Sequence, residues 1–364
     1  MLKGAKMKKN KKVLIVGSDS SVKGGITTVI NSLLNHDWEC IEMELLPTYI
    51  EGNAIEKIIF FLKAILKYIV KLIKKDFDIV HIHMSYNGSF YRKLLIVKLS
   101  NLFNKKIILH LHGSEFEEFY NNNNKSIKKL IKNIFDKSTY VIVLGERWNK
   151  IIKSISPMSN VKIFNNAVTV PSDTVKWNKN DIKVLFLGVL IKRKGIYELI
   201  EAINILRKKG IIEKNKLKFI IGGTGKEEAS IMNLINKYNI QDCVEMVGWV
   251  DGEQKTELLK QSQIFVLPSY NEGLPMAILE AMSFGIPTIS TNVGSVEEVV
   301  KNGYNGIIIN PGNVEALSSA INKLSYDEAE WKRYSINSKL IIEDYYDEVK
   351  YFDKMTDTYI EIMS

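Results

Sequence analysis

The sequence predicts two tandem α/β domains, each built on a parallel β-sheet, and three observations support this fold class. The chain has 364 residues, which is two to three times the usual length of one domain. Short apolar segments rich in β-branched residues alternate with segments whose apolar residues recur every 3.6 residues. This alternation stops in a polar stretch around 171–181 and then starts again. We therefore place a first domain at 1–175 and a second at 176–344, with a terminal helix at 345–364 that returns to the first domain.

Twelve short apolar segments bounded by polar or turn residues predict the strands. In the first half they are 13–17, 40–46, 79–83, 107–112, 140–145 and 161–168. In the second half they are 183–188, 217–223, 243–248, 264–269, 288–291 and 306–309. Parallel sheets bind ligands at the carboxyl ends of their strands, so we expect function in the loops that follow strands. Two such domains predict a ligand held between them.

Composition excludes several classes of protein. With 46% hydrophobic and 25% charged residues, the chain is neither disordered nor collagen-like. Lysines interrupt every apolar run before it reaches the ~20 residues that a membrane-spanning helix needs. The two cysteines, Cys40 and Cys243, lie far apart and form neither a disulfide framework nor a cysteine-rich metal site. We expect a cytoplasmic protein.

The charge is distributed unevenly, which predicts an anionic partner for the first half. Residues 1–170 hold 27 Lys and Arg against 14 Asp and Glu, whereas 171–364 hold 23 against 27. Between 53 and 75, an apolar helix carries Lys63, Lys67 and Lys71 at four-residue spacing. Such a helix can lie on the anionic inner face of the cell membrane as a peripheral contact. Alternatively, the apolar side of this helix packs on the first sheet and its lysines are solvated. A nucleic-acid partner is not expected, because the sequence has no helix-turn-helix and no basic-aromatic pattern.

The most informative segment is 268–287, Pro-Ser-Tyr-Asn-Glu-Gly-Leu-Pro-Met-Ala-Ile-Leu-Glu-Ala-Met-Ser-Phe-Gly-Ile-Pro. It predicts a strand end, a loop and a helix, with Pro275 in the first helical turn and Gly285 just past the end. Glu280 stands among apolar residues, where an unpaired buried carboxylate costs several kcal/mol, so a vicinal diol is a suitable partner. Glu272 can reach a second hydroxyl-bearing group. Alternatively, Glu280 pairs with a structural Lys or Arg and Glu272 caps the helix; the spacing leaves both alternatives open.

This segment resembles the E-x7-E signature of retaining glycosyltransferases of family 4, which have the GT-B fold of two Rossmann-like domains facing a cleft. The match includes the Glu-Gly-x-Pro turn and the Glu-Ala-Met-x-x-Gly-x-Pro that ends the helix. The resemblance implies that Glu272 binds hydroxyls of the donor sugar, that Glu280 binds the nucleotide ribose, and that backbone amides at Gly273 and Leu274 contact the donor. It is strongest over 183–312, and the first half resembles bacterial members that make capsular and other surface polysaccharides. The resemblance implies that the first domain binds the acceptor and the second the nucleotide sugar.

Residues 188–195, Gly-Val-Leu-Ile-Lys-Arg-Lys-Gly, resemble the family's G-R-L-x-x-x-K-G turn. The resemblance implies that Lys194 binds the donor diphosphate, and a lysine beside a helix N-terminus adds a full charge to the helix's partial one. Val189 replaces the family's usual arginine, so Lys192 or Arg193 is expected to compensate. The other donor-binding positions that the resemblance implies are Gly24, Gly25, Gly188, Gly223 and Trp249. Strand-to-helix turns for the glycines and a core position for the tryptophan are the alternatives.

All five histidines lie in the first half, and four of them alternate on two strand ends: His81, His83, His110 and His112. Such a pattern can bind zinc, but no carboxylate or thiol partner is evident, so no metal site is expected. The resemblance implies that His112 is the cleft histidine beside the sugar or its acceptor, with a catalytic role. Asp76 and Asp78 imitate a D-x-D metal motif, which we reject because these residues precede a strand.

The predicted function is retaining transfer of a hexosyl unit from a nucleotide-diphosphate sugar, with UDP as the expected nucleotide, to a glycan or lipid-linked saccharide acceptor. The resemblance implies front-face attack, in which the departing diphosphate helps to deprotonate the acceptor, with neither metal nor other cofactor. Two alternatives remain. One is a non-catalytic GT-B partner subunit that binds the donor, motivated by Val189. The other is a sugar-nucleotide epimerase. A nicotinamide dehydrogenase is disfavoured, because no G-x-G-x-x-G sequence follows the first strand.

Overall fold

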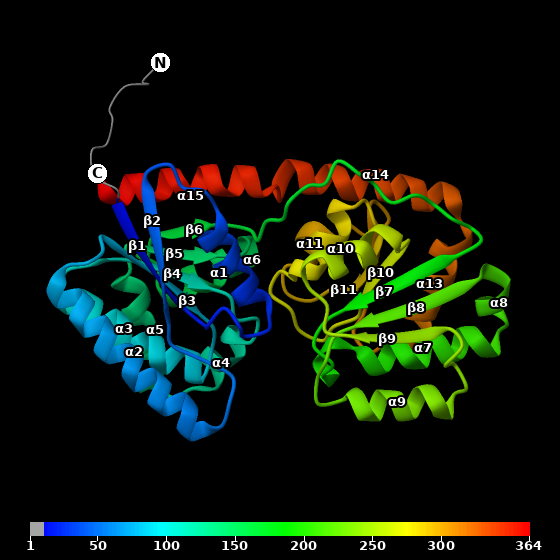
Figure 1. Ribbon diagram of the computed structural model, residues 1–364, viewed down its shortest axis with the longest axis horizontal. Coiled ribbons are helices and arrows are strands. Elements are labelled where there is room, and N and C mark those ends of the chain that lie inside the picture. Colours follow the sequence, from blue (N-terminus) through cyan, green and yellow to red (C-terminus); the bar gives the residue numbers. More distant parts are fainter. Residues whose placement is uncertain (1–10) are drawn as a thin grey trace, which may run out of the picture. The chain divides into compact units, whose positions relative to one another are not determined.

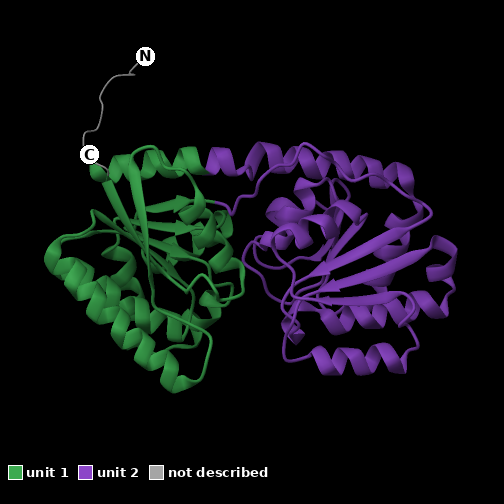
Figure 2. Ribbon diagram, viewed as in Figure 1, with its two compact units in different colours: residues 1–164, 352–364 green, residues 165–351 purple. Residues whose placement is uncertain are grey.

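The computed structural model describes residues 11–364, and the basic residues 1–10 lie outside the described residues. The chain divides into two compact units (Figure 2). One contains the chain up to Phe164 together with Phe352–Ser364, and the other is Asn165–Tyr351. The division falls just before the polar stretch around 171–181 in which the sequence placed it.

The first unit contains a parallel sheet whose six strands, counted over residues 11–164, have the order β2-β1-β3-β4-β5-β6 (Figure 1). The strands are β1 Lys11–Gly17, β2 Ile41–Pro47, β3 Ile79–Met84, β4 Lys106–Leu111, β5 Tyr140–Val143 and β6 Val161–Ile163. Every predicted strand of this half is confirmed, although β6 is shorter than 161–168. Val168 already belongs to the second unit, where its N–H donates to the carbonyl of Tyr346 at 2.9 Å. The four central residues of β1, Val13–Val16, are fully buried, which explains why the strand has an uninterrupted apolar run.

At least one helix lies between each strand and the next, as the crossover connections of a parallel sheet require. The helices are α1 Gly25–Asn35, α2 Ala54–Lys74, α3 Gly88–Leu102, α4 Phe116–Asn122, α5 Lys125–Asp136 and α6 Glu146–Ile155. The long helix α2 begins with a capping box, in which the Asn53 side chain accepts from the N–H of Glu56 and the Glu56 carboxylate accepts from the N–H of Asn53. None of the helices within residues 11–364 is long and apolar enough to cross a bilayer.

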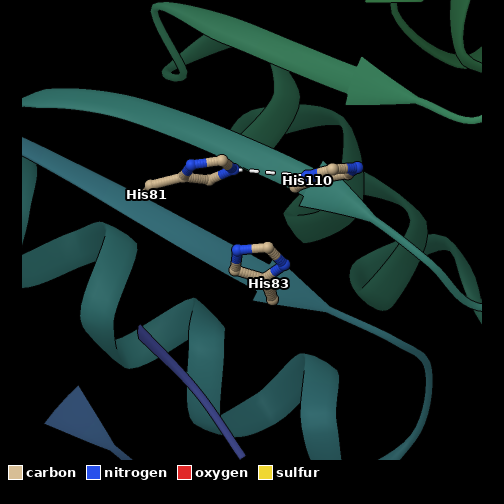
Figure 3. Close-up of side chains that lie close together, drawn as sticks. All are labelled: His81, His83 and His110. Carbon is tan, nitrogen blue, oxygen red and sulfur yellow. Dashed lines mark hydrogen bonds between the residues drawn. The ribbon is translucent and has the colours of Figure 1, made fainter. Parts of the chain in front are cut away.

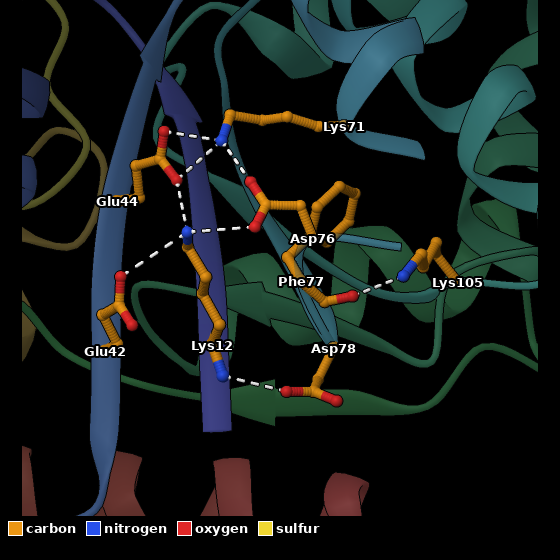
Figure 4. Close-up of polar contacts among 8 residues, drawn as sticks. All are labelled: Lys12, Glu42, Glu44, Lys71, Asp76, Phe77, Asp78 and Lys105. Carbon is orange, nitrogen blue, oxygen red and sulfur yellow. Dashed lines mark hydrogen bonds and ion pairs between the residues drawn. The ribbon is translucent and has the colours of Figure 1, made fainter. Parts of the chain in front are cut away.

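A charged network at the amino-terminal edge of the first sheet fixes the end of α2 (Figure 4). The ammonium groups of Lys12 and Lys71 both lie between Glu44 and Asp76, at distances of 2.6–3.4 Å. The hydrogen bond from Lys71 lowers the pKa of Asp76, and Asp78 accepts the backbone N–H of Lys12. Both aspartates of the D-x-D sequence therefore hold the sheet together at the edge opposite the expected ligand side. Lys71 is therefore neither a solvated lysine, as the packing alternative for α2 expected, nor one that is free to face a membrane.

The second unit has a parallel sheet of six strands among its residues 165–351, in the order β12-β11-β10-β7-β8-β9. The strands are β7 Ile182–Leu187, β8 Leu217–Gly222, β9 Val244–Gly248, β10 Ile264–Leu267, β11 Thr288–Thr291 and β12 Gly306–Ile309, so each predicted strand is confirmed. This is the doubly wound order, in which the chain reverses its direction of travel between β7 and β10. Ligands bind at such a switch point, outside the carboxyl ends of the two strands.

The helices of the second unit follow the same alternation. They are the 3₁₀ helix η1 Lys192–Lys194 and the α-helices α7 Ile196–Lys208, α8 Ile211–Asn215, α9 Glu228–Lys237, α10 Gly252–Gln261, α11 Met276–Ser283, α12 Val296–Val299, α13 Val314–Tyr326 and α14 Glu328–Tyr345. The last helix, α15 Glu348–Met363, starts in the second unit and continues in the first. There Phe352 stacks on His36 with ring centres 3.8 Å apart, and the Tyr359 hydroxyl lies 2.7 Å from Nδ1 of His81.

Candidate functional site

The loops after β7 and β10 meet at the switch point of the second sheet, because these two strands are paired through Ile264 and Val184. The ammonium of Lys194 lies 2.6 Å from Oε1 of Glu272. The Ser269 hydroxyl donates to the same oxygen at 2.7 Å. Glu272 is only 6% exposed, so this carboxylate is held in place by a cation and a hydroxyl rather than by water.

The backbone around Glu272 is closely packed, which fixes the direction of its side chain. The N–H of Tyr270 donates to the carbonyl of Arg193 at 2.8 Å, and the Arg193 guanidinium donates to the carbonyl of Asn271 at 3.1 Å. Gly294 has φ of 57°, and a Cβ at this position would lie 1.9 Å from the carbonyl oxygen of Glu272. Only glycine fits there, because any side chain would clash with the carbonyl oxygens of Glu272 and Gly273.

Three glycines bring the ends of β7, β8 and β9 into contact. Gly223 has φ of 148°, and a Cβ on it would lie 1.8 Å from the carbonyl oxygen of Gly188. Its N–H donates to the carbonyl of Gly248 at 2.6 Å. The structure thus joins the predicted positions Gly188 and Gly223. Trp249, next in sequence, is half-buried and donates from Nε1 to Asp251 at 3.2 Å, so it is not fully enclosed in the core.

The cations around the β7 loop differ in their surroundings. Lys192 is exposed at the start of η1, whereas the Arg193 guanidinium is committed to the carbonyl of Asn271. Val189 is half-buried between Gly188 and Leu190. Compensation for the missing arginine by Lys192 stays a prediction.

Helix α11 has the predicted boundaries to within one residue. Pro275 is its N-cap, and Gly285 follows its end with φ of 72°. Glu280 is half-buried and pairs with Lys255 of α10 at 2.7 Å. The premise that this carboxylate lacks a protein partner is therefore wrong: the lysine comes from a different helix, and its spacing from Glu280 gave no signal. The alternative of a lysine partner describes this contact, and ribose binding by Glu280 stays a prediction.

The loop before α11 is anchored through its carbonyl groups. The carbonyl of Leu274 accepts from the Asn166 amide at 2.7 Å, and the carbonyl of Gly273 accepts from the N–H of Ser295 at 2.8 Å. Leu274 is buried and Gly273 is partly exposed. The bond to the Gly273 carbonyl sets the orientation of the peptide unit that carries the N–H of Leu274, one of the two amides we expected to contact a donor.

In the first unit, four histidines form a ladder on one face of β3 and β4, of which Figure 3 shows three. Nε2 of His81 lies 3.3 Å from Nδ1 of His110, and Nδ1 of His83 lies 2.9 Å from Nε2 of His112. Burial lowers the pKa of His81 and of His112 to about 3. The imidazole of His112 is therefore neutral at physiological pH, and it can hydrogen-bond a hydroxyl without carrying charge.

Three of these histidines have the geometry of potential metal ligands. One ring nitrogen from each of His81, His83 and His110 lies within 4.8 Å of the others, and all three residues are buried. Nε2 of His83 and Nε2 of His110 have no hydrogen-bond partner among residues 11–364, whereas both nitrogens of His81 have one. A metal would have to displace the contacts of His81. The expectation of a metal-free protein stays a prediction.

Gly24 and Gly25 begin α1 in the first unit. Gly24 has φ of 143°, and a Cβ on it would meet no atom within 4 Å, so the space in front of this turn is open. The structure therefore places Gly24, Gly25 and His112 in one unit and the Lys194–Glu272 pair in the other.

Sequence reasoning missed Lys255, Ser269 and the adjacent cations Arg92 and Lys93 of α3. Lys93 did carry a signal, because it lies three or four residues from Phe90, Ile96 and Val97, which are all buried. A lysine on the buried stripe of an amphipathic helix is unusual, and it marks a position to inspect for function.

Comparisons with known proteins place this geometry in context. A family model described as glycosyl transferases group 1 matches residues 172–340. The chain is 26% identical over 280 residues to the amylovoran biosynthesis glycosyltransferase AmsK of Erwinia amylovora, covering 74% of this chain and 67% of that protein. It is 29% identical over 316 residues to the Escherichia coli UDP-Gal:alpha-D-GlcNAc-diphosphoundecaprenol alpha-1,3-galactosyltransferase, covering 80% and 78%.

Solved structures share the fold at low sequence identity. Sucrose-phosphate synthase from Thermosynechococcus elongatus superposes with a TM-score of 0.78 and 17% identity, covering 97% of this chain and 99% of that one. HepE of Anabaena in complex with UDP gives a TM-score of 0.77 and 15% identity, covering 96% and 100%. The two α/β units are those of the GT-B fold, as predicted.

Proposed function

We propose that the chain is a GT-B glycosyltransferase of surface-polysaccharide synthesis, and that it is a retaining enzyme of family 4 that transfers a hexosyl unit from a UDP-sugar to a lipid-linked saccharide. The observation that carries this proposal is the Lys194–Glu272 pair at the switch point of the second sheet. This is the place in a doubly wound unit where a nucleotide ligand binds. The printed name of the E. coli relative, with a UDP-sugar and a diphosphoundecaprenol acceptor, supports the choice of substrates.

The pair suits both parts of a sugar diphosphate. An ammonium has three donors, so Lys194 can keep its bond to Glu272 and still donate to a phosphate oxygen. Glu272 then presents its carboxylate to hydroxyls of the sugar. In the reaction, the acceptor oxygen forms a bond to the anomeric carbon while the bond from that carbon to the diphosphate oxygen breaks, and the acceptor proton passes to the departing diphosphate. Lys194 stabilises the charge that develops on this leaving group.

We assign Glu280 to the ribose of the nucleotide. Its carboxylate is oriented by Lys255 at 2.7 Å and is only half-buried, so it has access to a ligand. A carboxylate offers about four acceptor sites, and one lysine occupies only part of this capacity. The two hydroxyls of a ribose are suitable donors for the remainder.

A thermal-shift titration tests nucleotide binding. We expect UDP to raise the melting temperature of the wild-type protein more than GDP or ADP does, and Glu280→Ala to lose most of this response. Glu257→Ala is the matched control, because Glu257 is an exposed carboxylate on α10 that contacts only Lys260 among its described ion-pair partners. An unchanged UDP response in Glu280→Ala would contradict the ribose assignment.

Product analysis separates transfer from its two alternatives. A new sugar nucleotide formed from the donor in the absence of any acceptor would favour an epimerase. Copurification with an active homologue and no turnover with any donor would favour a non-catalytic partner subunit. Val189→Arg restores the residue usual in the family, and a gain in turnover would show that the site is catalytic and weakened by the valine. Retention is tested by the anomeric configuration of the product.

Helix α2 supports peripheral contact with an anionic membrane on the cytoplasmic side. Its inward face, with Tyr68 and Leu72, packs on the unit, as one alternative predicted. A second apolar stripe runs along its outer face and is exposed: Ile55, Ile58, Ile59, Leu62, Leu66, Val70 and Ile73. The exposed Lys63, Lys67 and Lys74 each follow a residue of this stripe, so they line one of its sides. An apolar face bordered by cations complements an anionic lipid surface, with about 1 kcal/mol contributed per lysine.

Flotation with liposomes tests this contact. We expect the wild-type protein to float with vesicles that contain phosphatidylglycerol and much less with neutral vesicles. The double variant Leu66→Ser/Ile73→Ser should lose binding, because both side chains are 65% exposed and face outward on α2. Ile336→Ser on α14, where the side chain is 61% exposed, is the matched control. Equal flotation of both variants would contradict the assignment of α2.

A further inference from the structure

A cavity of about 290 Å³ lies at the carboxyl ends of β1, β2 and β3 in the first unit. Its walls include Gly24 and Gly25 at the start of α1, His83 at the end of β3, and Arg92 and Lys93 of α3. In this sheet β2 and β3 lie on opposite sides of β1, so β1 borders the switch point, the place where an α/β sheet binds ligands. The donor contacts proposed above at Lys194, Glu272 and Glu280 lie in the other unit, and within this cavity wall the resemblance assigned only Gly24 and Gly25 to the donor.

Lys93 is a buried cation without an acidic partner. Its side chain is 2% exposed, and its ammonium contacts only neutral oxygens among the described residues, the carbonyl of Gly17 and the hydroxyl of Thr48. Burial, together with the charge of Arg92, lowers the pKa of Lys93 well below its usual value. A buried ammonium that is not compensated by a carboxylate destabilises a protein, so its position calls for a ligand that compensates it.

Two further polar groups in the cavity wall are unsatisfied. Nε of Arg92 and Nε2 of His83 are buried and have no hydrogen-bond partner among residues 11–364. His83 is 2% exposed, and the Arg92 guanidinium lies 4.9 Å from the centre of the Tyr49 ring. Within the described part of the chain, no Asp or Glu lines the cavity. The wall therefore offers the cations Arg92 and Lys93, and an anion is the ligand that satisfies them.

We propose that this cavity binds a phosphoryl group and that its occupant is the diphosphate of the lipid-linked acceptor. The choice of the acceptor rests on the proposed function, whereas phosphoryl binding does not. Arg92 and Lys93 of α3 line the cavity together with the Gly24–Gly25 turn. The two cations suit phosphate oxygens, and the glycines let a ligand approach the backbone closely.

The attachment of α2 to α3 favours the acceptor over the donor as the source of the diphosphate. The Tyr68 hydroxyl of α2 lies 2.5 Å from the Ser100 hydroxyl of α3, and both residues are fully buried. The helix that carries the exposed apolar stripe is thus fixed to the helix that carries Arg92 and Lys93. A lipid-linked diphosphate lies at the headgroup level of a membrane, and contact of α2 with that membrane would bring the unit that holds the cavity to its surface.

Calorimetric titration of the full chain with inorganic pyrophosphate tests the site. We expect Lys93→Met to weaken binding at least tenfold and Arg92→Met to weaken it similarly, while Lys98→Met, which changes an exposed lysine of the same helix, binds as the wild type does. Lys93→Met should also melt at the same or a higher temperature without ligand, because it removes a buried uncompensated charge. Wild-type affinity in both Lys93→Met and Arg92→Met would overturn the proposal.

Repeating the titration in saturating UDP distinguishes the two sources of a diphosphate. Pyrophosphate binding that still depends on Lys93 in the presence of UDP supports the acceptor. Competition between UDP and pyrophosphate for the Lys93-dependent site would overturn the acceptor as occupant and assign the cavity to the donor. A chain that binds pyrophosphate through Lys93 but transfers no sugar would contradict the proposed function and leave the phosphoryl site standing.

Discussion

Replacing Lys194 by methionine should destabilise the protein and should do so through Glu272. The two side chains are 17% and 8% exposed, so the pair is largely shielded from water. Removing one partner of a buried ion pair costs ~3–5 kcal/mol, because the remaining charge is left uncompensated. The Ser269 hydroxyl continues to donate to the carboxylate, so we expect the lower end, about 3 kcal/mol. Lys194→Met/Glu272→Gln should recover most of this loss, because no buried charge remains.

Urea unfolding of the four proteins of this double-mutant cycle measures the coupling, and Lys192→Met provides the matched control for stability. Lys192 is exposed two residues away, so its loss should change the unfolding free energy by less than about 0.5 kcal/mol. Transfer activity should be lost in both Lys194→Met and the double variant, since each lacks the cation for the diphosphate. If the double variant is as unstable as Lys194→Met, or if it retains transfer, the interpretation of this pair is wrong.

Three further predictions concern other parts of the chain. Burial lowers the pKa of His81 from 6.5 to about 3, so between these values only the unfolded chain binds the proton. Acidification from pH 6.5 to 5 should therefore lower the free energy of unfolding by about 2 kcal/mol, and His81→Gln should avoid this loss. Urea unfolding at each pH measures the difference. Gly223→Ala should lower the free energy of unfolding by more than about 1 kcal/mol and weaken UDP binding. Gly210→Ala is the control, because Gly210 also has a positive φ but a Cβ there meets no atom within 4 Å. This control should leave UDP binding unchanged. Dialysis against a chelator should leave the transfer rate unchanged, and a loss restored by zinc would instead assign a metal to His81, His83 and His110.

The sequence predicted the strands well because each follows from local information. The strands β1, β5 and β10 each contain an uninterrupted run of four apolar residues. In β6 only three residues pair, and the rest of the predicted strand leaves the sheet. The helix α11 was equally local, since Pro275 and Gly285 mark its limits. The partner of Glu280 was not predictable, because the contact with Lys255 depends on how two helices pack and not on any spacing within either of them. The division of lysines on α2 was missed for the same reason: Lys71 turns to Glu44 and Asp76, which come from other elements.

Unsatisfied buried charge distinguishes the functional end of each sheet from its structural end. At the amino-terminal edge of the first sheet, Lys12 and Lys71 are neutralised by acidic neighbours, which is what stability alone requires. At the opposite edge, Lys93 is more deeply buried and has no acidic neighbour among the described residues. A chain selected only for stability would replace this lysine by an apolar residue, since the cavity could then close without desolvating a charge. A lysine at this buried position is therefore best explained by an anion that the protein must hold, and the response of Lys93→Met to pyrophosphate decides whether it does.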